Sequence, residues 1–566
     1  MMEKPFNEEI KKDKRIAYFS MEIGIDSRIP TYSGGLGILA GDTLKSCADL
    51  KVPVIAVTLL YRKGYFYQKL DDAGRQIELP AQWTPSDFLE LLPDKITVEI
   101  ENRNVTVQAW KYNLKSVDEN YSVPILFLDT DISANTDYGR ALTNYLYGGD
   151  EKYRLAQEIV LGVGGVRMLR KLGYTDIKKY HMNEGHASLL ALELLRENKR
   201  SEDVFNFDEV RNLCVFTTHT PVPAGHDKFS YDLVRNVLGE PIPLDVLKTL
   251  AGEENLNMTL LALNLSEYIN GVAKKHGEIS REMFPGYPID SITNGVHPYS
   301  WAPESFRKLY NKYIPGWAKD PFTLRYIISI PKIEIWNAHM EAKIKLIDYI
   351  NKESNTGMDY ETFTIGFARR ASTYKRAGLL FFDVDRLIDI SKKAGKIQIV
   401  FAGKAHPKDI PGKELIKGIF ECTHRIKNDI KIVYLENYDM ELGKMVTSGV
   451  DLWLNTPLRP REASGTSGMK ASLSGVPNFS VLDGWWVEGC IEGITGWSIG
   501  KKSIEENSDE KDAQDLYKKL ENIIIPMFYK EKEQWLNIMQ YCIAFNASFF
   551  NTHRMVHEYV LNAYLE

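Results

Sequence analysis

The segment Glu462–Lys470 reads EASGTSGMK and runs directly into ASLSGVPNFSVLDGWWVEG, residues 471–489. Glycines and small hydroxyl residues precede a single lysine, so backbone N–H groups can approach an anion closely where a helix begins. A short apolar run of strand type, Asn478–Leu482, follows that helix. Loop, helix and buried strand in this order are typical of an α/β fold.

Lys470 has two interpretations from this segment alone. A lysine just inside the helix can bind an anion or, when desolvated, can act as an amine that condenses with a carbonyl cofactor. Alternatively, the segment is an ordinary Gly/Ser-rich cap and Lys470 is a solvated surface residue.

Similar apolar, β-rich runs recur along the chain and alternate with helical patterns such as Arg154–Arg170, Ala377–Ile390 and Ala513–Ile525. Strands buried on both faces and separated by helices indicate parallel sheets with helical crossovers, and ligands then bind beyond the carboxyl ends of the strands. The predicted strands are Ile16–Ile23, Val54–Leu60, Val123–Asp129, Leu213–Thr218, Phe363–Phe367, Ile397–Ala402, Ile430–Leu435, Asp451–Asn455 and Asn478–Leu482.

A proline-punctuated stretch, Pro315–Pro331, precedes a new helical pattern at Lys332–Lys352 and suggests a domain boundary. We therefore expect a first α/β domain over residues 1–315 and a second over 332–530. Aromatic-rich helices over 531–566 are expected to pack back across both.

Composition excludes several classes of protein. The chain has 566 residues, 44% of them apolar and 26% charged, with a net charge of −6. This charge argues against nucleic-acid binding, and no apolar run is long enough to span a bilayer. Five scattered cysteines form no CxxC pair and indicate reduced thiols. We expect a cytoplasmic protein without nucleic-acid or membrane partners.

Two further segments have the composition of anion sites. SGGLG, at Ser33–Gly37, follows the first predicted strand, and its glycines would let the backbone approach an anion. It could equally be a tight turn without a ligand. GFARRASTYKRAG, at Gly366–Gly378, gathers four cations after another strand. A bound phosphate would offset their repulsion, whereas a solvated basic face is the alternative.

Three histidine-containing loops carry weaker signals. In HMNEGH, at His181–His186, the two His are five apart and do not share a helix face, so a hydrogen-bonding role is favoured over a metal site. THTPVPAGHD (Thr218–Asp227) and TNGVHPYSW (Thr293–Trp301) are similar loops. GVGG, at Gly162–Gly165, lies within a helical pattern and is not a dinucleotide fingerprint.

Taken together, these segments resemble the α-glucan phosphorylases, enzymes that depend on pyridoxal phosphate, and specifically their short microbial branch. The resemblance implies the GT-B arrangement, two Rossmann-like domains facing a cleft. The matching motifs run in order through most of the chain: SGGLG, RLAQE (Arg154–Glu158), MNEGH (Met182–His186), THT (Thr218–Thr220), TNGVHPYSW, RRASTYKR (Arg369–Arg376), LENY (Leu435–Tyr438) and EASGTSGMK.

The resemblance assigns the residues around the cofactor and phosphate. It implies that Lys470 forms the Schiff base with pyridoxal 5'-phosphate, whose phosphate relays a proton to the substrate phosphate. Positions implied near the two phosphates and the cofactor are Arg370, Lys375, Gly35, Arg369, Thr466, Tyr438 and Trp301.

The implied reaction is reversible phosphorolysis of terminal α-1,4-glucosidic bonds by inorganic phosphate, which gives glucose 1-phosphate with retention of configuration. Residues that match sugar-binding or guarding positions are Glu462, Ser464, Gly465, His219, Asn294, Glu184 and Asp150. A homodimer is the family expectation.

Some positions depart from the longer family members. Asp439 follows Tyr438 where Arg is usual, so Arg459 or Arg461 would have to rebuild the contacts to the cofactor phosphate. Glu184 replaces an Asp, and Ser467-Gly468 replaces Gly-Asn. Only 33 residues precede Gly34, which predicts an enzyme without a phosphorylation segment.

The main alternative is a glucan synthase of the same fold that uses a nucleotide sugar. Such enzymes often carry two Glu eight positions apart, whereas the eighth position after Glu462 is Lys470. A non-catalytic glucan-binding protein and an aminotransferase are further alternatives. The first would be expected to lack Lys470, Arg370 or Lys375, and the second has a different fold and motif order.

Overall fold

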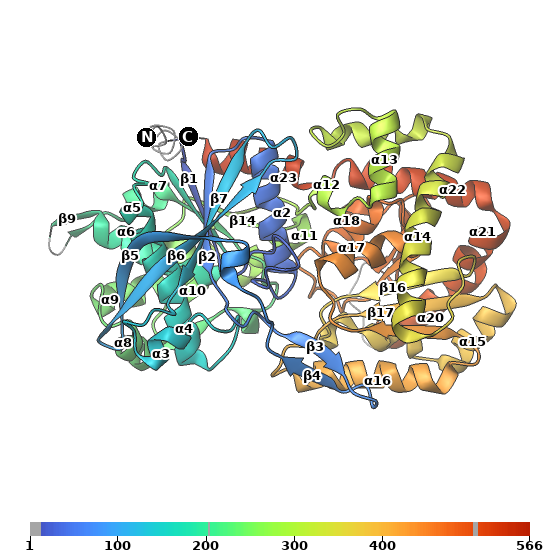
Figure 1. Cartoon of the computed structure of the whole chain (residues 1–566), viewed down its shortest axis with the longest axis horizontal. Coiled ribbons are helices and arrows are strands. Elements are labelled where there is room, and N and C mark those ends of the chain that lie inside the picture. Colours follow the sequence, from blue (N-terminus) through green and yellow to red (C-terminus); the bar gives the residue numbers. More distant parts are fainter. Residues whose placement is uncertain (1–12, 202–203, 502–507, 566) are drawn as a thin grey trace. The chain divides into compact units, whose positions relative to one another are not determined.

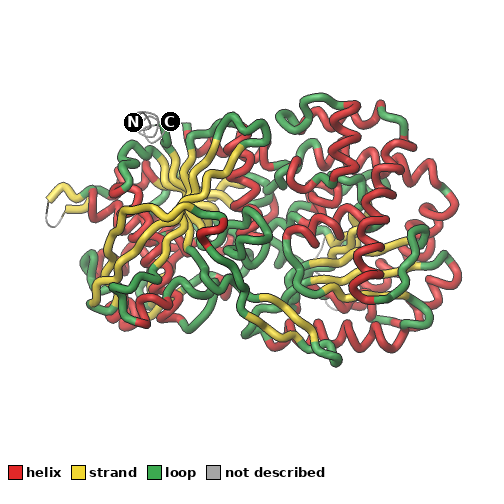
Figure 2. The backbone as a smooth tube through the Cα atoms, in the orientation of Figure 1, coloured by secondary structure: helices red, strands yellow, loops and turns green. Residues whose placement is uncertain are grey.

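Each of the two main sheets has its first strand in the interior, with later strands added on both sides. Figure 1 labels strands of both sheets and many of the helices around them. The computed structural model describes residues 13–201, 204–501 and 508–565. Helices alternate with many of the strands along the chain and lie beside the sheets (Figure 2), as expected of an α/β protein. All nine predicted strands are present, with ends that differ by a few residues.

The first sheet has nine strands, of which the seven from β15 to β7 are parallel. A long antiparallel hairpin, β6 and β5, extends it. In order across the sheet the strands are β15 (Ile289–Ser291), β14 (Tyr268–Gly271), β11 (Cys214–Thr217), β8 (Lys179–Asn183), β1 (Ile16–Ser20), β2 (Val54–Leu59), β7 (Ser122–Asp129), β6 (Arg103–Lys115) and β5 (Glu90–Ile100).

The second sheet has six strands, all parallel, in the order third, second, first, fourth, fifth, sixth along the chain. This is the doubly wound order, and its switch point lies between the first and fourth strands. The strands are β18 (Lys431–Leu435), β17 (Ile397–Ala402), β16 (Phe363–Ala368), β19 (Leu452–Asn455), β20 (Asn478–Val481) and β21 (Gly496–Ile499).

The chain divides into two compact units. Unit 1 comprises Met1–Phe66, Pro80–Ile292 and Met555–Glu566, and unit 2 comprises Tyr67–Leu79 and Thr293–Arg554. The boundary thus differs from the expected one: Pro315–Pro331 lies inside unit 2, because the helices on either side of it, α13 (Glu304–Tyr313) and α14 (Lys332–Ser354), pack together.

Unit 1 contains most of the shorter helices and two small strand pairs, β9–β10 (Lys199–Ser201, Val204–Phe205) and β12–β13 (Lys228–Ser230, Asn255–Asn257). Its helices are α2 (Gly35–Asp49), α3 (Asp137–Ala141), α4 (Glu151–Ile159), α5 (Gly165–Lys171), α6 (Leu189–Glu197), α7 (Phe207–Leu213), α8 (Tyr231–Val237), α9 (Leu244–Ala251), α10 (Met258–Asn264) and α11 (Lys274–Met283). The residues of GVGG lie in the continuous helical stretch that joins α4 to α5.

Unit 2 contains the longest helix, α14, and a hairpin, β3 (Tyr67–Leu70) and β4 (Gln76–Leu79), that comes from the early part of the chain. Its helices are α12 (Pro298–Trp301), α13 (Glu304–Tyr313), α14 (Lys332–Ser354), α15 (Val384–Lys393), α16 (Ile410–Ile426), α17 (Met440–Gly449), α18 (Ser467–Ser472), α19 (Trp486–Gly489), α20 (Ser508–Lys519), α21 (Ile525–Lys530) and α22 (Lys532–Tyr541). Helix α23 (Thr552–Tyr559) crosses the boundary between the units.

One predicted helix is interrupted. The segment Ala377–Ile390 contains a short 3-10 helix, Ala377–Phe381, followed by α15. Asp383 separates them because its carboxylate accepts a hydrogen bond from the backbone N–H of Arg386, at 2.9 Å, and thereby caps α15.

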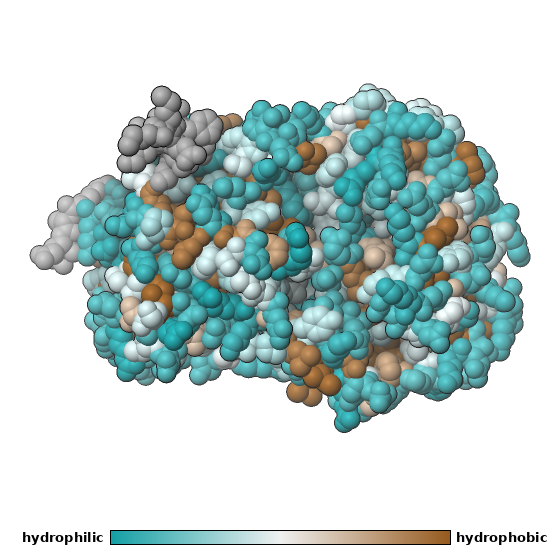
Figure 3. Space-filling model, in the orientation of Figure 1, coloured by the Kyte–Doolittle hydropathy of each residue, from teal (hydrophilic) through white to brown (hydrophobic). Residues whose placement is uncertain are grey.

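The burial pattern explains why the central strands are apolar throughout. In β1, Ala17 and Phe19 pack into one core cluster of unit 1, whereas Ile16 and Tyr18 pack into another. A strand between two cores must be apolar at every position. The face shown in Figure 3 is mostly hydrophilic, with apolar residues in small separate patches. Among the described residues, no helix is long and apolar enough to cross a membrane.

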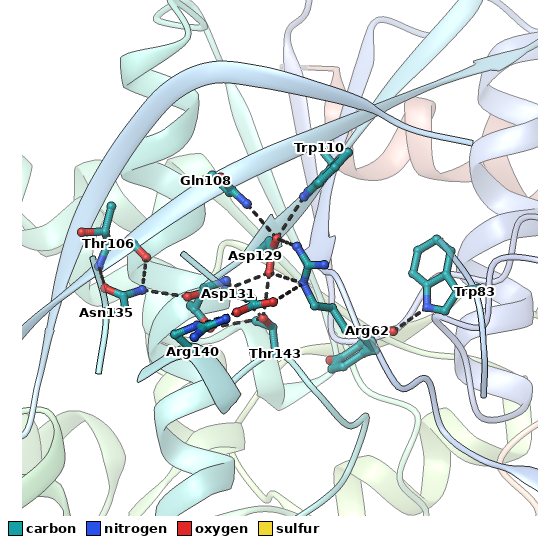
Figure 4. A network of polar contacts seen from close by, with 12 residues as sticks. Arg62, Trp83, Thr106, Gln108, Trp110, Asp129, Asp131, Asn135, Arg140 and Thr143 are labelled. Atoms are coloured by element: carbon teal, nitrogen blue, oxygen red, sulfur yellow. Dashed lines mark hydrogen bonds and ion pairs between the residues drawn. The ribbon is translucent and has the colours of Figure 1, made fainter. Parts of the chain in front are cut away.

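Asp129, at the end of β7, is the centre of a buried polar network in unit 1 (Figure 4). Its carboxylate accepts hydrogen bonds from Arg62 at 2.6 Å, Gln108 at 2.9 Å and Trp110 at 3.0 Å. Burial alone would raise the pKa of Asp129, but the bonds from Arg62 and Gln108 outweigh burial and lower it.

Replacing Asp129 should therefore destabilise the protein. We expect Asp129→Asn to reduce the free energy of unfolding by about 2–4 kcal/mol, because Arg62 loses its buried partner. Because the folded pKa is lowered, the stabilisation is present above the unfolded carboxyl pKa of about 4 and is lost as the pH falls through the folded value. Urea unfolding at several pH values measures this difference. Glu119→Gln, at an exposed ion pair with Lys115, is the control and should change stability by less than about 1 kcal/mol.

Candidate functional site

The switch point of the second sheet brings together two loops that are rich in charged residues. Strands β16 and β19 are neighbours, with Gly366 paired to Trp453. Beyond their carboxyl ends, the hydroxyl of Thr456 donates a hydrogen bond to the carbonyl oxygen of Lys375 at 3.0 Å, and the Leu458 N–H donates to the Tyr374 carbonyl oxygen at 2.7 Å. The RRASTYKR loop is therefore fixed to the segment that leads into EASGTSGMK.

Glu462 joins these two loops through its carboxylate. One oxygen, Oε2, lies 2.7 Å from Nη2 of Arg369 and 2.5 Å from Nζ of Lys375. All three side chains are at most 10% exposed. Burial alone would raise the pKa of Glu462, but the two cations outweigh burial and lower it to about 2. Glu462 is therefore a carboxylate at any physiological pH.

Arg369 has hydrogen-bonding capacity left over. Its Nη1 group is buried and has no hydrogen-bond partner among the residues that the structure describes. A buried N–H group of a cation without an acceptor is costly, so this atom fits a bound anion. Arg370, by contrast, is exposed.

Lys470 lies in α18 and is 7% exposed. Its Nζ is 3.6 Å from the centre of the Trp301 ring, which is itself 2% exposed. The interpretation of Lys470 as a solvated surface residue is thus wrong. A lysine amine buried against an aromatic face is stabilised by a cation–π contact and is largely removed from water.

Several other predicted residues also lie in unit 2. Ser464 Oγ and Asn294 Oδ1 are buried and have no hydrogen-bond partner within the described ranges, so both can bind a polar ligand. Gly465 adopts a left-handed conformation, with φ of 72°, beside Glu462. Thr466 directly precedes α18. Burial raises the pKa of Tyr438, with the nearby charge of Arg369 opposing the increase.

The structure shows the contacts of Asp439, which stands where an Arg is usual, and of the two arginines expected to compensate for it. The Asp439 carboxylate accepts a hydrogen bond from the Leu442 N–H at 2.9 Å and caps α17. Arg459, one of the two residues expected to compensate, forms an ion pair with Asp512 at 2.8 Å. Arg461 is exposed.

In unit 1, Glu184 and His219 lie next to each other beyond the carboxyl ends of β8 and β11. Glu184 Oε2 accepts hydrogen bonds from the His219 backbone N–H at 2.7 Å and from Thr220 Oγ1 at 3.0 Å. The His219 Nε2 atom is 2.7 Å from Asn183 Oδ1. Burial lowers the pKa of His219 to about 4, so the imidazole is neutral at neutral pH and Nε2–H donates to Asn183.

The two His of HMNEGH have different environments. Both ring nitrogens of His181 are hydrogen-bonded, Nδ1 to Tyr564 at 2.6 Å and Nε2 to Thr217 at 2.9 Å. His186 Nε2 lies 3.2 Å from Asp227. These contacts agree with the hydrogen-bonding role that the five-residue spacing favours.

The remaining predicted residues of unit 1 lie at helix starts. Gly35 is the first residue of α2 and is exposed, and a Cβ atom built there would meet nothing within 4 Å. Asp150 caps α4, since its Oδ1 accepts a hydrogen bond from the Tyr153 N–H at 2.9 Å.

Sequence reasoning missed two acids that hold these loops. Glu22, two residues beyond β1, accepts hydrogen bonds from the glycine loop. Asp483 Oδ2 accepts a hydrogen bond from the Glu462 N–H at 2.9 Å, and burial raises the pKa of Asp483 to about 6. Their position just after a buried strand was the available signal.

Comparison with known proteins gives a consistent family. A family model described as carbohydrate phosphorylase matches residues 31–147 and 244–496. These ranges include the glycine loop and the charged cluster of unit 2, whereas Glu184 and His219 lie between them. Maltodextrin phosphorylase of Thermococcus litoralis is 41% identical over 97% of this chain and 70% of its own length. Glycogen phosphorylases of Mycobacterium tuberculosis and Aquifex aeolicus are 36% and 34% identical over 97% of this chain, covering 70% and 86% of their lengths.

The cluster of Glu462, Arg369 and Lys375 makes a prediction that does not depend on the reaction. Glu462→Gln leaves two buried cations without their shared carboxylate. The variant should have a lower melting temperature, and its free energy of unfolding should fall by about 3–5 kcal/mol. Inorganic phosphate should then raise the melting temperature of the variant more than that of the wild type, because it replaces the lost negative charge. Thermal unfolding with and without phosphate measures both effects.

The exposed acid Glu304, which pairs with Lys308, supplies the control. Glu304→Gln should leave the melting temperature and its phosphate dependence nearly unchanged. An equal phosphate response in wild type and Glu462→Gln would show that Glu462 does not occupy an anion site.

Proposed function

Because this chain belongs to the carbohydrate phosphorylase family, we propose that it catalyses reversible phosphorolysis of terminal α-1,4-glucosidic bonds of glycogen, starch or maltodextrin. The product is α-glucose 1-phosphate, with retention of configuration. The observation that carries the proposal is the pairing of Arg369 and Lys375 on one buried carboxylate, with an N–H group of Arg369 still open. We also propose that the two units, each built on a largely parallel sheet, have the GT-B arrangement.

The residues of unit 2 fit pyridoxal 5'-phosphate as the cofactor. Lys470 offers a buried amine, Trp301 an aromatic face beside it, and Arg369 an open N–H group for a phosphate oxygen. When bound, the cofactor supplies a phosphate group that can donate and accept a proton next to the substrate phosphate. Thr466 and Tyr438 complete the proposed cofactor-binding residues.

The chain's own cations would hold the substrate phosphate. Two phosphates at close range repel each other strongly, and this repulsion must be offset by positive charge. Lys375 and the exposed Arg370 supply it from unit 2, and the Gly35 N–H is proposed to contribute a hydrogen bond. Arg369 is proposed to bind the cofactor phosphate.

Hydroxyl groups of the terminal glucosyl unit need polar partners of fixed orientation. Ser464 and Asn294 carry buried polar atoms with no partner in the described part of the chain, and the ionised Glu462 can accept hydrogen bonds. Gly465, His219, Glu184 and Asp150 complete the proposed substrate-binding set. Such bonds accelerate the reaction when they strengthen as positive charge develops on the sugar ring.

The decisive experiment is phosphate-dependent release of glucose 1-phosphate from maltodextrin by the enzyme supplied with pyridoxal phosphate. Lys470→Ala and Lys470→Arg should each lower the rate by about a hundredfold or more, because neither side chain can condense with the cofactor. Lys470→Arg preserves the positive charge and so separates covalent attachment from simple anion binding.

Lys393→Ala, at an exposed lysine of α15, is the matched control and should retain full activity. Full activity of Lys470→Arg would contradict the assigned role of the amine. Glucosyl transfer from a nucleotide sugar, without phosphorolysis, would instead support a glucan synthase.

A further inference from the structure

The glycine loop of unit 1 is held by an internal carboxylate. Glu22 Oε2 accepts hydrogen bonds from the backbone N–H of Ser33 at 2.5 Å and of Gly34 at 3.3 Å, and the Ser33 hydroxyl lies 3.1 Å from both carboxylate oxygens. Glu22 is only 2% exposed. A Cβ atom at Gly37 would lie 2.6 Å from the same oxygen, so glycine is required there.

This arrangement determines which N–H groups of the loop remain open. The N–H groups of Ser33 and Gly34 are bonded to Glu22, whereas those of Gly35, Leu36 and Gly37 have no acceptor among the described residues. Open space surrounds the position where a Cβ of Gly35 would lie. The carboxylate thus holds the start of the loop and leaves the next N–H groups open.

Tyr147 holds the other oxygen of the same carboxylate. Its hydroxyl donates to Glu22 Oε1 at 2.9 Å, and burial raises the pKa of Tyr147, so the hydroxyl keeps its proton. The Arg154 guanidinium lies 4.6 Å from the centre of the Tyr147 ring. Tyr147 has φ of 56°, an uncommon left-handed conformation that needs support from its surroundings.

That support comes from the network of Asp129 (Figure 4). The Thr143 hydroxyl and the Arg62 guanidinium both donate hydrogen bonds to the Asp129 carboxylate. The backbone N–H of Arg62 also donates to the Thr143 carbonyl oxygen, at 3.1 Å. The Leu146 N–H donates to the Gly64 carbonyl oxygen at 3.1 Å, directly before Tyr147. The segment that carries Tyr147 is therefore fixed to the loop after β2.

We infer that Glu22 is a positioning residue for phosphate binding at the glycine loop, and that Tyr147 fixes Glu22 in place. The inference rests on the proposed function. Glu22 acts through the backbone of Ser33 and Gly34, so its loss should weaken phosphate binding and leave glucan binding unchanged. Because the Tyr147 hydroxyl is bonded to Glu22, we expect this hydroxyl and the Glu22 carboxylate to act as one unit.

The test compares Glu22→Gln, Tyr147→Phe and the double variant by steady-state phosphorolysis. Glu22→Gln should raise the KM for phosphate about tenfold, the size expected for losing charge-assisted hydrogen bonds, with the KM for maltodextrin changed less than about twofold. Tyr147→Phe should raise the KM for phosphate roughly threefold. The double variant should match Glu22→Gln, since coupled residues are not additive.

Tyr61→Phe is the control for removing a buried hydroxyl beside Glu22. Tyr61 donates to the Met21 carbonyl oxygen at 2.7 Å and makes no bond to the Glu22 carboxylate, so the KM for phosphate should stay within about twofold of the wild-type value. Equal increases in both KM values, or additive effects in the double variant, would overturn the inference.

Hydrogen exchange tests the same inference without any activity. In Glu22→Gln, the amides of the peptide 32–38 should exchange faster than in the wild type, while melting temperature and circular dichroism confirm that the variant is folded. Unchanged exchange in a folded variant would overturn the positioning role. Absence of phosphorolysis by the wild type would overturn the proposed function instead, so the two failures are distinguishable.

Discussion

The ion triplet of Glu462, Arg369 and Lys375 is the constraint on which the charged loops of unit 2 depend. Two buried cations near each other would be unstable without a negative charge, and Glu462 supplies one with a single oxygen atom. The carboxylate comes from the loop after β19, and the cations come from the loop after β16. The interaction therefore fixes the geometry of both loops at the switch point of the sheet.

The same physical solution appears in unit 1 with backbone groups in place of cations. There the N–H groups of Ser33 and Gly34 converge on the Glu22 carboxylate. In both units an internal carboxylate orients groups suited to anions, and part of their capacity stays open: Nη1 of Arg369 in one unit and the N–H of Gly35 in the other. Preorganised donors of this kind need no rearrangement when a ligand arrives.

Local patterns were sufficient for the strands buried on both faces, because apolar runs between helices leave few alternatives. They failed for β8, whose sequence KYHMN alternates polar and apolar residues although every residue is buried. The polar side chains of β8 are satisfied by partners distant in the sequence, such as Tyr564 for His181. The hairpin β3–β4 was also missed, because its Gln68 and Gln76 bond to the loop after β17, more than 300 residues away.

In the candidate site, too, local sequence patterns do not reveal contacts between residues that are distant in the sequence. The sequence identifies Glu462, Arg369 and Lys375 singly, but their pairing joins positions 87 and 93 residues apart and required the fold. Asp439 illustrates the consequence. Its carboxylate caps the start of α17. An acid at this position disfavours the binding of an anionic ligand beside it. Arg369 has one N–H group bonded to Glu462 and another still open, and can therefore hold a further anion without releasing Glu462. The loss of an Arg at position 439 is thus compatible with an anion site built on Arg369.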